Sequence, residues 1–196
     1  LSLHDALPIL RLYDEKGNRG RKEGTGLFTR ALMEAYPWLP VEEDGRLHDP
    51  QLRENFVERL FALHELNTLR ANGLTRRGLL DFHSRYKLQL LAHHQAGYRE
   101  IGPFVASMHQ WQDLDAFFVA YRDKLMAILK NTASRKNHTN VLMHIQGYFR
   151  ERLNSRQRGE LRDVILDYRA GLLPILAPLT LLKHYLAEYP DQIGRA

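Results

Sequence analysis

The chain has 196 residues, 44% of them hydrophobic, and its 28 lysines and arginines against 23 acidic residues give a net charge of +5. It contains no cysteine, which excludes disulfides, thiolate nucleophiles and cysteine-bound metal clusters within this chain. Charges or histidines interrupt every apolar run before it reaches about 18 residues, so no membrane span is predicted. We expect one main domain, in the cytoplasm, with a charge balance that favours polyanionic partners.

The first nine residues, Leu1 to Ile9, read LSLHDALPI. They lack the basic start and the small-residue cleavage site of a signal peptide. The same nine residues result from translating CTTTCCCTACACGACGCTCTTCCGATC, which matches a common sequencing-library adapter. We therefore interpret residues 1–9 as an adapter translation and expect the natural chain to extend upstream, where it could hold another domain.

Residues 10–48 predict a short strand, a helix and a connection. The alternation from Leu10 to Tyr13 is typical of a strand, here separated from its sheet, and residues 14–26 are rich in turn formers. Residues 27–35 have helical apolar spacing, with Thr25 as the expected N-cap and Pro37 as the stop. A non-helical connection then leads to the next helix.

The strongest helix start is at Asp49, a capping acid directly before Pro50 at the first helical position. This helix is expected to end at Asn72 and Gly73. Its predicted apolar face holds Leu52, Phe56, Val57, Leu60, Phe61 and His64. Thr75 is expected to cap a second helix that ends near Gly97. The predicted apolar face of that helix holds Leu79, Phe82, Tyr86 and Leu90.

The rest of the chain also has helical periodicity. A short helix is expected at residues 101–111, and a long one after Asp113 or Asp115 that dissolves in the polar run at residues 131–140. Further helices are expected at residues 141–153, after Ser155 and at residues 179–189, with Pro174 and Pro178 as breaks. The prediction is therefore an all-α, multi-helix, bundle-like domain at residues 49–190, preceded by a remnant strand and helix.

Ten histidines raise the question of a metal site. The sequence has no HExxH spacing, and His93 and His94 are adjacent, so they point in different directions on a helix. No metal site is expected. His83 and Lys87 are four residues apart and share a helix face. Two interpretations stay open for them: a histidine at the edge of the core beside an extended lysine, or a ligand-facing pair.

The most informative segment is residues 135–153. Arg135 and Lys136 open it, polar side chains follow, and a helix begins whose N-terminus attracts anions, so we expect a phosphate to bind there. Gln146 and Arg150 are expected to face outward, and Gly147 suggests a close backbone approach. The predicted buried stripe consists of Val141, Leu142, Ile145 and Phe149. The alternative is a helix–helix contact at Gly147 and a solvated cationic loop.

Charge is distributed unevenly along the chain. Residues 122–169 contain eleven cations against five acids, whereas residues 42–58 contain six acids against two arginines. Such an asymmetric field suits a protein that approaches nucleic acid in one orientation, although solvated helix faces also produce charge bias.

Four segments, taken in order, resemble the YbgA family of bacterial proteins: residues 26–61, FHSRYKLQLLAHHQAGYREIG, NHTNVLMHIQGYF and YRAGLLPILAPLTLLKHYL. In that family a helical domain follows a smaller α/β domain similar to thiouracil desulfidases, which hold a [4Fe–4S] cluster with three cysteines. The resemblance implies that residues 10–48 are the tail and linker of that domain. It also implies that this chain is truncated at its N-terminus and lacks the catalytic cysteines.

The resemblance implies a functional surface made of residues from two motifs. The residues it transfers, together with Arg135 and Lys136 from the charge argument, give the predicted RNA-binding set of His83, Lys87, Arg135, Lys136, His138, Asn140, His144, Gln146 and Tyr148. Gly147 belongs to the same motif. No catalytic residue is carried over, and no cofactor is expected in this chain.

Three functions are weighed. The leading one is a tRNA-binding module of a protein that removes sulfur from thiouridine in tRNA, with tRNA and the missing catalytic domain as partners. The second is a helical docking or self-association domain without RNA contact. The third, an independent enzyme with a polar pocket around His83 and His138, ranks last because the sequence offers no readable acid–base pair or nucleophile.

Overall fold

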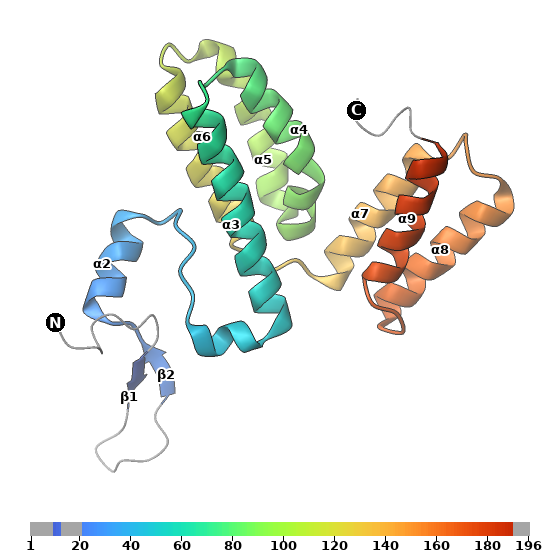
Figure 1. Cartoon of the computed structure of the whole chain (residues 1–196), viewed down its shortest axis with the longest axis horizontal. Coiled ribbons are helices and arrows are strands. Elements are labelled where there is room, and N and C mark those ends of the chain that lie inside the picture. Colours follow the sequence, from blue (N-terminus) through green and yellow to red (C-terminus); the bar gives the residue numbers. More distant parts are fainter. Residues whose placement is uncertain (1–9, 13–20, 190–196) are drawn as a thin grey trace.

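The computed structural model describes residues 10–12 and 21–189 (Figure 1). The proposed adapter translation at residues 1–9 lies outside these residues. Strands β1 (Leu10–Leu12) and β2 (Arg21–Gly24) pair antiparallel, with a bulge between Leu10 and Arg11. The first strand is therefore confirmed. It is not isolated, however, because part of the predicted turn-rich stretch supplies its partner.

Helix α2 (Leu27–Ala35) begins one residue later than an N-cap at Thr25 would place it. Gly26 is the N-cap, without a side-chain hydrogen bond, so the capping role predicted for Thr25 is wrong. The helix buries Thr29 and leaves Leu27 and Phe28 exposed. A short 3-10 helix, η1 (Asp44–His48), then leads to the first long helix.

Helix α3 (Pro50–Ala71) starts as predicted. The Asp49 side chain accepts hydrogen bonds from the backbone N–H groups of Gln51 and Leu52, at 2.8 and 3.0 Å. The helix ends at Asn72, and Gly73 takes the left-handed conformation (φ 102°) that favours glycine.

The predicted apolar face of α3 is wrong. The helix buries Asn55, Arg59, Ala62, Leu63 and Leu66. Val57, Leu60 and Phe61 are exposed instead, with Phe61 68% accessible. The neighbouring helices contact the face that carries these two polar residues, and Asn55 donates a hydrogen bond to the carbonyl of Leu129 there.

The region from Thr75 to Gly97, predicted to be one helix, contains one helix and the start of another. Helix α4 (Arg76–His93) is capped by Thr75 as predicted, but it ends four residues before Gly97. The His94 side chain accepts from the Gly97 N–H at 3.0 Å and so caps α5 (Gln95–Ala106), which continues through Pro103 into the 3-10 helix η2 (Ser107–Gln110). A capping histidine is an uncommon signal, which is why the break was missed.

The remaining helices are α6 (Leu114–Leu129), α7 (Arg135–Tyr148), α8 (Ser155–Ala170) and α9 (Leu176–Glu188). Asp113 caps α6 as predicted, and Asn154 rather than Ser155 caps α8. Among residues 10–12 and 21–189 the only strands are β1 and β2, so the all-α prediction is confirmed. Every helix of the described residues is too short or too polar to span a lipid bilayer.

Two hydrophobic cores hold these helices, which form two groups, α3 to α6 and α7 to α9, in Figure 1. The first lies among α3 to α6 and includes Phe82, Phe117 and Tyr121. The second lies among α7, α8 and α9 and includes Leu142, Phe149 and Tyr185. Helices α4 and α7 pack against each other and join the two groups. Helical periodicity in the sequence did not predict that the helices pack around two cores instead of one.

Candidate functional site

Helix α7 begins earlier than predicted, at Arg135, with the Ser134 side chain accepting from the Asn137 N–H. Residues 135–140, the second part of the polar run that was expected to be a loop, are therefore the first turns of a helix. Its position is determined by the Ser134 cap and by Thr139, whose side chain is buried and donates to the Arg135 carbonyl at 2.8 Å.

Arg135 and His138 both contact Tyr168 of α8. The Arg135 guanidinium donates to the Tyr168 backbone oxygen at 3.0 Å and lies 5.1 Å from the centre of its ring. Nδ1 of His138 lies 2.8 Å from the Tyr168 hydroxyl. These side chains help to line a cavity of about 360 Å³ between α3, the α6–α7 connection and α8.

Two carboxylates, Glu54 and Glu58, line the same cavity. A cavity that combines two carboxylates with one arginine, an imidazole and a phenol suits hydrogen bonds to a neutral polar group better than it suits a phosphate. The phosphate contact of Arg135 stays a prediction, and the guanidinium already has a partner in Tyr168.

Burial lowers the pKa of His138; the charges of His93 and Arg135 lower it further, and Glu58 raises it. A lowered folded-state pKa means that the unfolded chain binds protons first as the pH falls, so the stability that this histidine contributes is present above pH 6.5 and lost below it.

We expect His138→Gln to lose less stability than wild type between pH 7 and 5 in urea titrations. Equal losses of stability in His138→Gln and in wild type would contradict this contribution of His138.

A buried polar network beside this cavity was missed in the sequence. The Asn55 amide donates to the Leu129 carbonyl at 2.9 Å. Nδ1 of His93 lies 2.6 Å from the Asn131 carbonyl, and its Nε2 lies 3.1 Å from a Glu58 oxygen. These contacts connect α3, α4 and the end of α6. The sequence signal was a polar residue at helical spacing beside apolar ones, which is equally typical of an exposed face.

His83 and Lys87 lie on α4, as predicted. Nδ1 of His83 lies 3.2 Å from the hydroxyl of the buried Tyr121, and the two rings meet edge to face. Burial lowers the pKa of His83, and the charge of Lys87 adds to this effect. Burial also raises the pKa of Tyr121 well above its ordinary range. The Tyr121 contact favours the core-edge interpretation of His83.

The other predicted residues on α7 separate into two environments. Gln146 does not face outward as predicted, because its amide donates to the Arg158 carbonyl of α8 at 2.9 Å. His144 and Tyr148 contact each other at 3.0 Å on the helix surface. Lys136 and Asn140 are exposed. The predicted set is therefore spread over the helix and does not converge on one point.

The close backbone approach predicted at Gly147 is wrong. A methyl group built at this position meets no other atom within 4 Å.

Alanine loses less backbone entropy on folding than glycine, so Gly147→Ala should raise the free energy of unfolding by about 0.4–1 kcal/mol. Thermal or urea unfolding checks this. A destabilised variant would restore the packing interpretation.

The turn between α7 and α8, residues 149–154, and the first turn of α8 carry three exposed arginines, of which only Arg150 was predicted to face outward. Phe149 and Leu153 are buried and anchor the turn. The Arg158 guanidinium donates to the Arg150 and Leu153 carbonyls at 2.7 and 2.9 Å. We define the arginine turn as the exposed residues Arg150, Arg152 and Arg156, none of which forms an ion pair with another described residue.

No group of three or more histidine, cysteine, aspartate or glutamate side chains in the described part of the chain is arranged to hold a metal ion. Since the chain also has no cysteine, its own residues do not fit an iron–sulfur cluster. The cluster expected from the resemblance would need ligands outside this chain.

Comparisons with known proteins give one family. The model of a family described as a protein of unknown function, DUF1722, matches residues 87–194. The uncharacterized protein YbgA of Escherichia coli (strain K12) is 55% identical over 133 residues, which cover 68% of this chain and 79% of that protein. No solved structure matches.

Proposed function

The chain belongs to the DUF1722 family of YbgA-like proteins, and from this premise we propose that it is the RNA-binding helical part of a protein that removes sulfur from thiouridine in tRNA. The sulfur chemistry would belong to an upstream domain with a [4Fe–4S] cluster. In this proposal the chain contributes tRNA binding and has two partners, tRNA and that catalytic domain.

The observation that carries the proposal is the arginine turn. Arg150, Arg152 and Arg156 are exposed cations without acidic partners in the described residues. The buried anchors Phe149 and Leu153 and the Arg158 hydrogen bonds hold the backbone between them in one conformation. A backbone that is ordered before binding loses little further entropy when the side chains that it carries contact phosphates.

The charge around the turn supports the same surface. Other cations of residues 122–169 are already engaged: Arg122 stacks 4.0 Å from the Trp38 ring centre and pairs with Asp123, and Arg162 pairs with Asp163. The arginine turn, Lys130, Lys136 and Arg169 are therefore the exposed cations of the basic half that neither pair with an acid nor lie over an aromatic ring in the described residues, and three of these six belong to the arginine turn.

The test is tRNA affinity as a function of salt. Replacing Arg150, Arg152 and Arg156 together by glutamine should weaken binding and lower the slope of log affinity against log salt by about one unit for each lost phosphate contact. Fluorescence anisotropy with labelled tRNA at several potassium chloride concentrations measures both quantities.

The matched control replaces three exposed arginines outside α7 and α8, namely Arg30, Arg77 and Arg99, by glutamine. It changes the net charge equally and should leave the slope unaltered. If both triple variants bind tRNA alike, only net charge matters and the arginine turn is not the interface.

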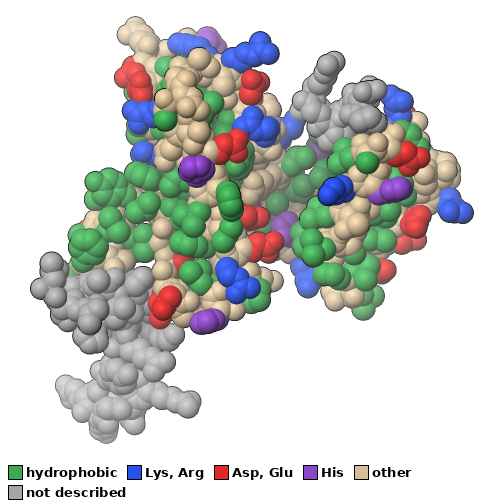
Figure 2. Space-filling model, in the orientation of Figure 1, with side chains coloured by type: hydrophobic (Ala, Val, Ile, Leu, Met, Phe, Trp, Pro, Cys, Tyr) green, Lys and Arg blue, Asp and Glu red, His purple; other side chains and the backbone are tan. Residues whose placement is uncertain are grey.

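A second function, docking or self-association, is favoured by a different observation. Val57, Leu60 and Phe61 form an exposed apolar face on α3, and Figure 2 shows apolar side chains gathered on this side of α3 and on α2. Exposed apolar patches are common at protein interfaces. Sedimentation velocity tests this alternative: Leu60→Gln with Phe61→Gln should abolish any self-association that wild type shows.

A further inference from the structure

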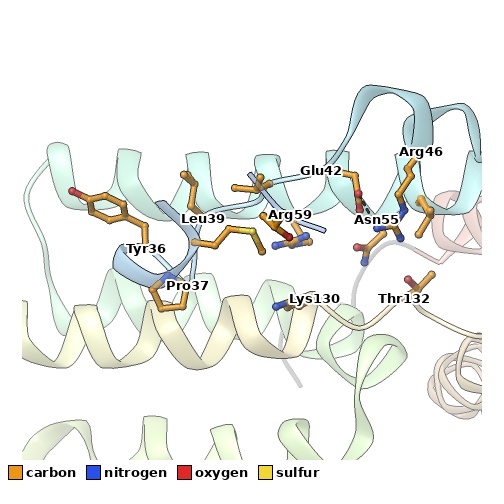
Figure 3. Close-up of a pocket in the computed structure, with 13 residues that line it drawn as sticks. Tyr36, Pro37, Leu39, Glu42, Arg46, Asn55, Arg59, Lys130 and Thr132 are labelled. Carbon is orange, nitrogen blue, oxygen red and sulfur yellow. Dashed lines mark ion pairs between the residues drawn. The ribbon is translucent and has the colours of Figure 1, made fainter. Parts of the chain in front are cut away.

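A second cavity, of about 410 Å³, lies between α2, the connection at residues 36–46, α3 and the end of α6 (Figure 3). It adjoins the cavity at His138, because Asn55 and Thr132 line both. The arginine turn does not contribute to it. Its chemistry differs from that of the His138 cavity, since its charged lining consists of three cations and one acid.

Arg59 is the central residue of this cavity. It is only 7% exposed, and its Nε–H meets no hydrogen-bond acceptor in the described residues. Burial lowers the pKa of this guanidinium, and the charge of Glu42 only partly opposes the effect. A buried guanidinium with an unused donor destabilises a fold unless an acceptor binds it.

The other charges leave an excess of positive charge. Glu42 is already paired with Arg46 at 3.0 Å. Lys130, at the end of α6, adds a second cation without a carboxylate partner in the described residues. Figure 3 shows the Arg59 and Lys130 nitrogens directed toward the same space from α3 and α6. Two cations around one space match the charge of a phosphate dianion, and an arginine fork matches its oxygen geometry.

The rest of the lining is apolar and includes Met33, Leu39, Val41 and Leu52, with Tyr36 at one end. Such walls suit the organic body of a ligand, which they would remove from water. We propose that this cavity binds a small molecule with a phosphate monoester, held by Arg59 and Lys130, and an apolar or aromatic body against these side chains.

The depth of Arg59 favours a free small molecule over an RNA backbone. A phosphodiester carries a sugar on both sides, so a strand would have to enter the cavity to reach a side chain that is 7% exposed. A monoester can enter with its phosphate first. The inference is therefore independent of tRNA binding at the arginine turn.

The first experiment uses the whole chain with inorganic phosphate and with uridine 5′-monophosphate as probes. Both should raise the melting temperature at constant ionic strength relative to chloride, because a ligand that binds only the folded state stabilises it. Calorimetric titration should show that the monophosphate binds and that uridine does not. No phosphate-dependent shift in wild type overturns the proposal.

Substitutions test which residues bind the phosphate. Arg59→Met should weaken binding of the monophosphate about tenfold or more while keeping or raising the melting temperature without ligand, since it removes an unpaired buried charge. Lys130→Gln, at an exposed position, should also weaken binding, and Lys183→Gln at an exposed position on α9 serves as the matched control. If Arg59→Met does not fold, the Lys130 and Lys183 pair decides. Wild-type affinity in Lys130→Gln and in any folded Arg59→Met overturns the site.

The tRNA assay separates this proposal from the previous one. Arg59→Met should bind tRNA with unaltered affinity and salt slope, and the triple variant of the arginine turn should keep phosphate binding. Weaker tRNA binding by Arg59→Met would identify the phosphate as part of the RNA and would overturn the free-ligand proposal.

Discussion

Replacing Phe149 by alanine should lower the free energy of unfolding by about 3–5 kcal/mol, the usual range for a buried phenylalanine. The side chain is 2% exposed, packs in the second core and lies 6.3 Å, centre to centre, from the Tyr185 ring. It also anchors the arginine turn, so its loss should weaken tRNA binding as well. Urea denaturation followed by circular dichroism measures the stability.

The location of the effect is as informative as its size. Because the two cores are separate clusters, hydrogen exchange in Phe149→Ala should increase in α7 to α9 more than in α3 to α6. Phe61→Ala is the matched control, since Phe61 is exposed, and it should change stability by less than about 0.5 kcal/mol. A large effect of Phe61→Ala would mean that α3 buries the face predicted from its periodicity.

Phe82→Ala should have a comparable effect, about 3–5 kcal/mol, on the first core. Phe82 is fully buried, stacks on Tyr86 at 4.4 Å between ring centres and meets the Tyr121 ring edge to face. The cavity left by its removal would lie among α3 to α6, where neighbouring helices prevent collapse.

The same hydrogen-exchange experiment should place this effect on α3 to α6. Uniform loss of protection over both groups in Phe82→Ala and in Phe149→Ala would contradict the separation and indicate a single cooperative unit. Phe82→Leu provides a graded comparison, because it retains most of the buried volume and should cost less than the alanine variant.

Signals contained in a few neighbouring residues predicted the helix starts. Asp49 before Pro50, Thr75 and Asp113 each cap the helix expected of them, because a side-chain oxygen can satisfy a free N–H within its own turn whatever surrounds it. The break at His94 was not predicted, because a histidine caps a helix only in one orientation of its ring.

Burial within α3 could not be predicted in the same way. The helix has apolar residues on more than one face, and the neighbouring helices contact the face with Asn55 and Arg59 and leave that with Leu60 and Phe61 exposed. Asn55 is buried because it donates to the carbonyl of Leu129, 74 residues away in the chain. Periodicity along one helix holds no information about a partner that distant.

The all-α class, the family, the starts of α3, α4 and α6, and the basic half were predictable from the sequence, because these depend on local capping, periodicity, composition and matching motifs. Which charges are engaged and which are available depends on the tertiary structure. Arg135 contacts Tyr168, whereas the arginine turn has no acidic partner in the described residues and Arg59 is buried without one for its Nε–H. The reason is physical: the state of a charge depends on neighbours within a few ångströms, and in this fold most of those neighbours come from other helices.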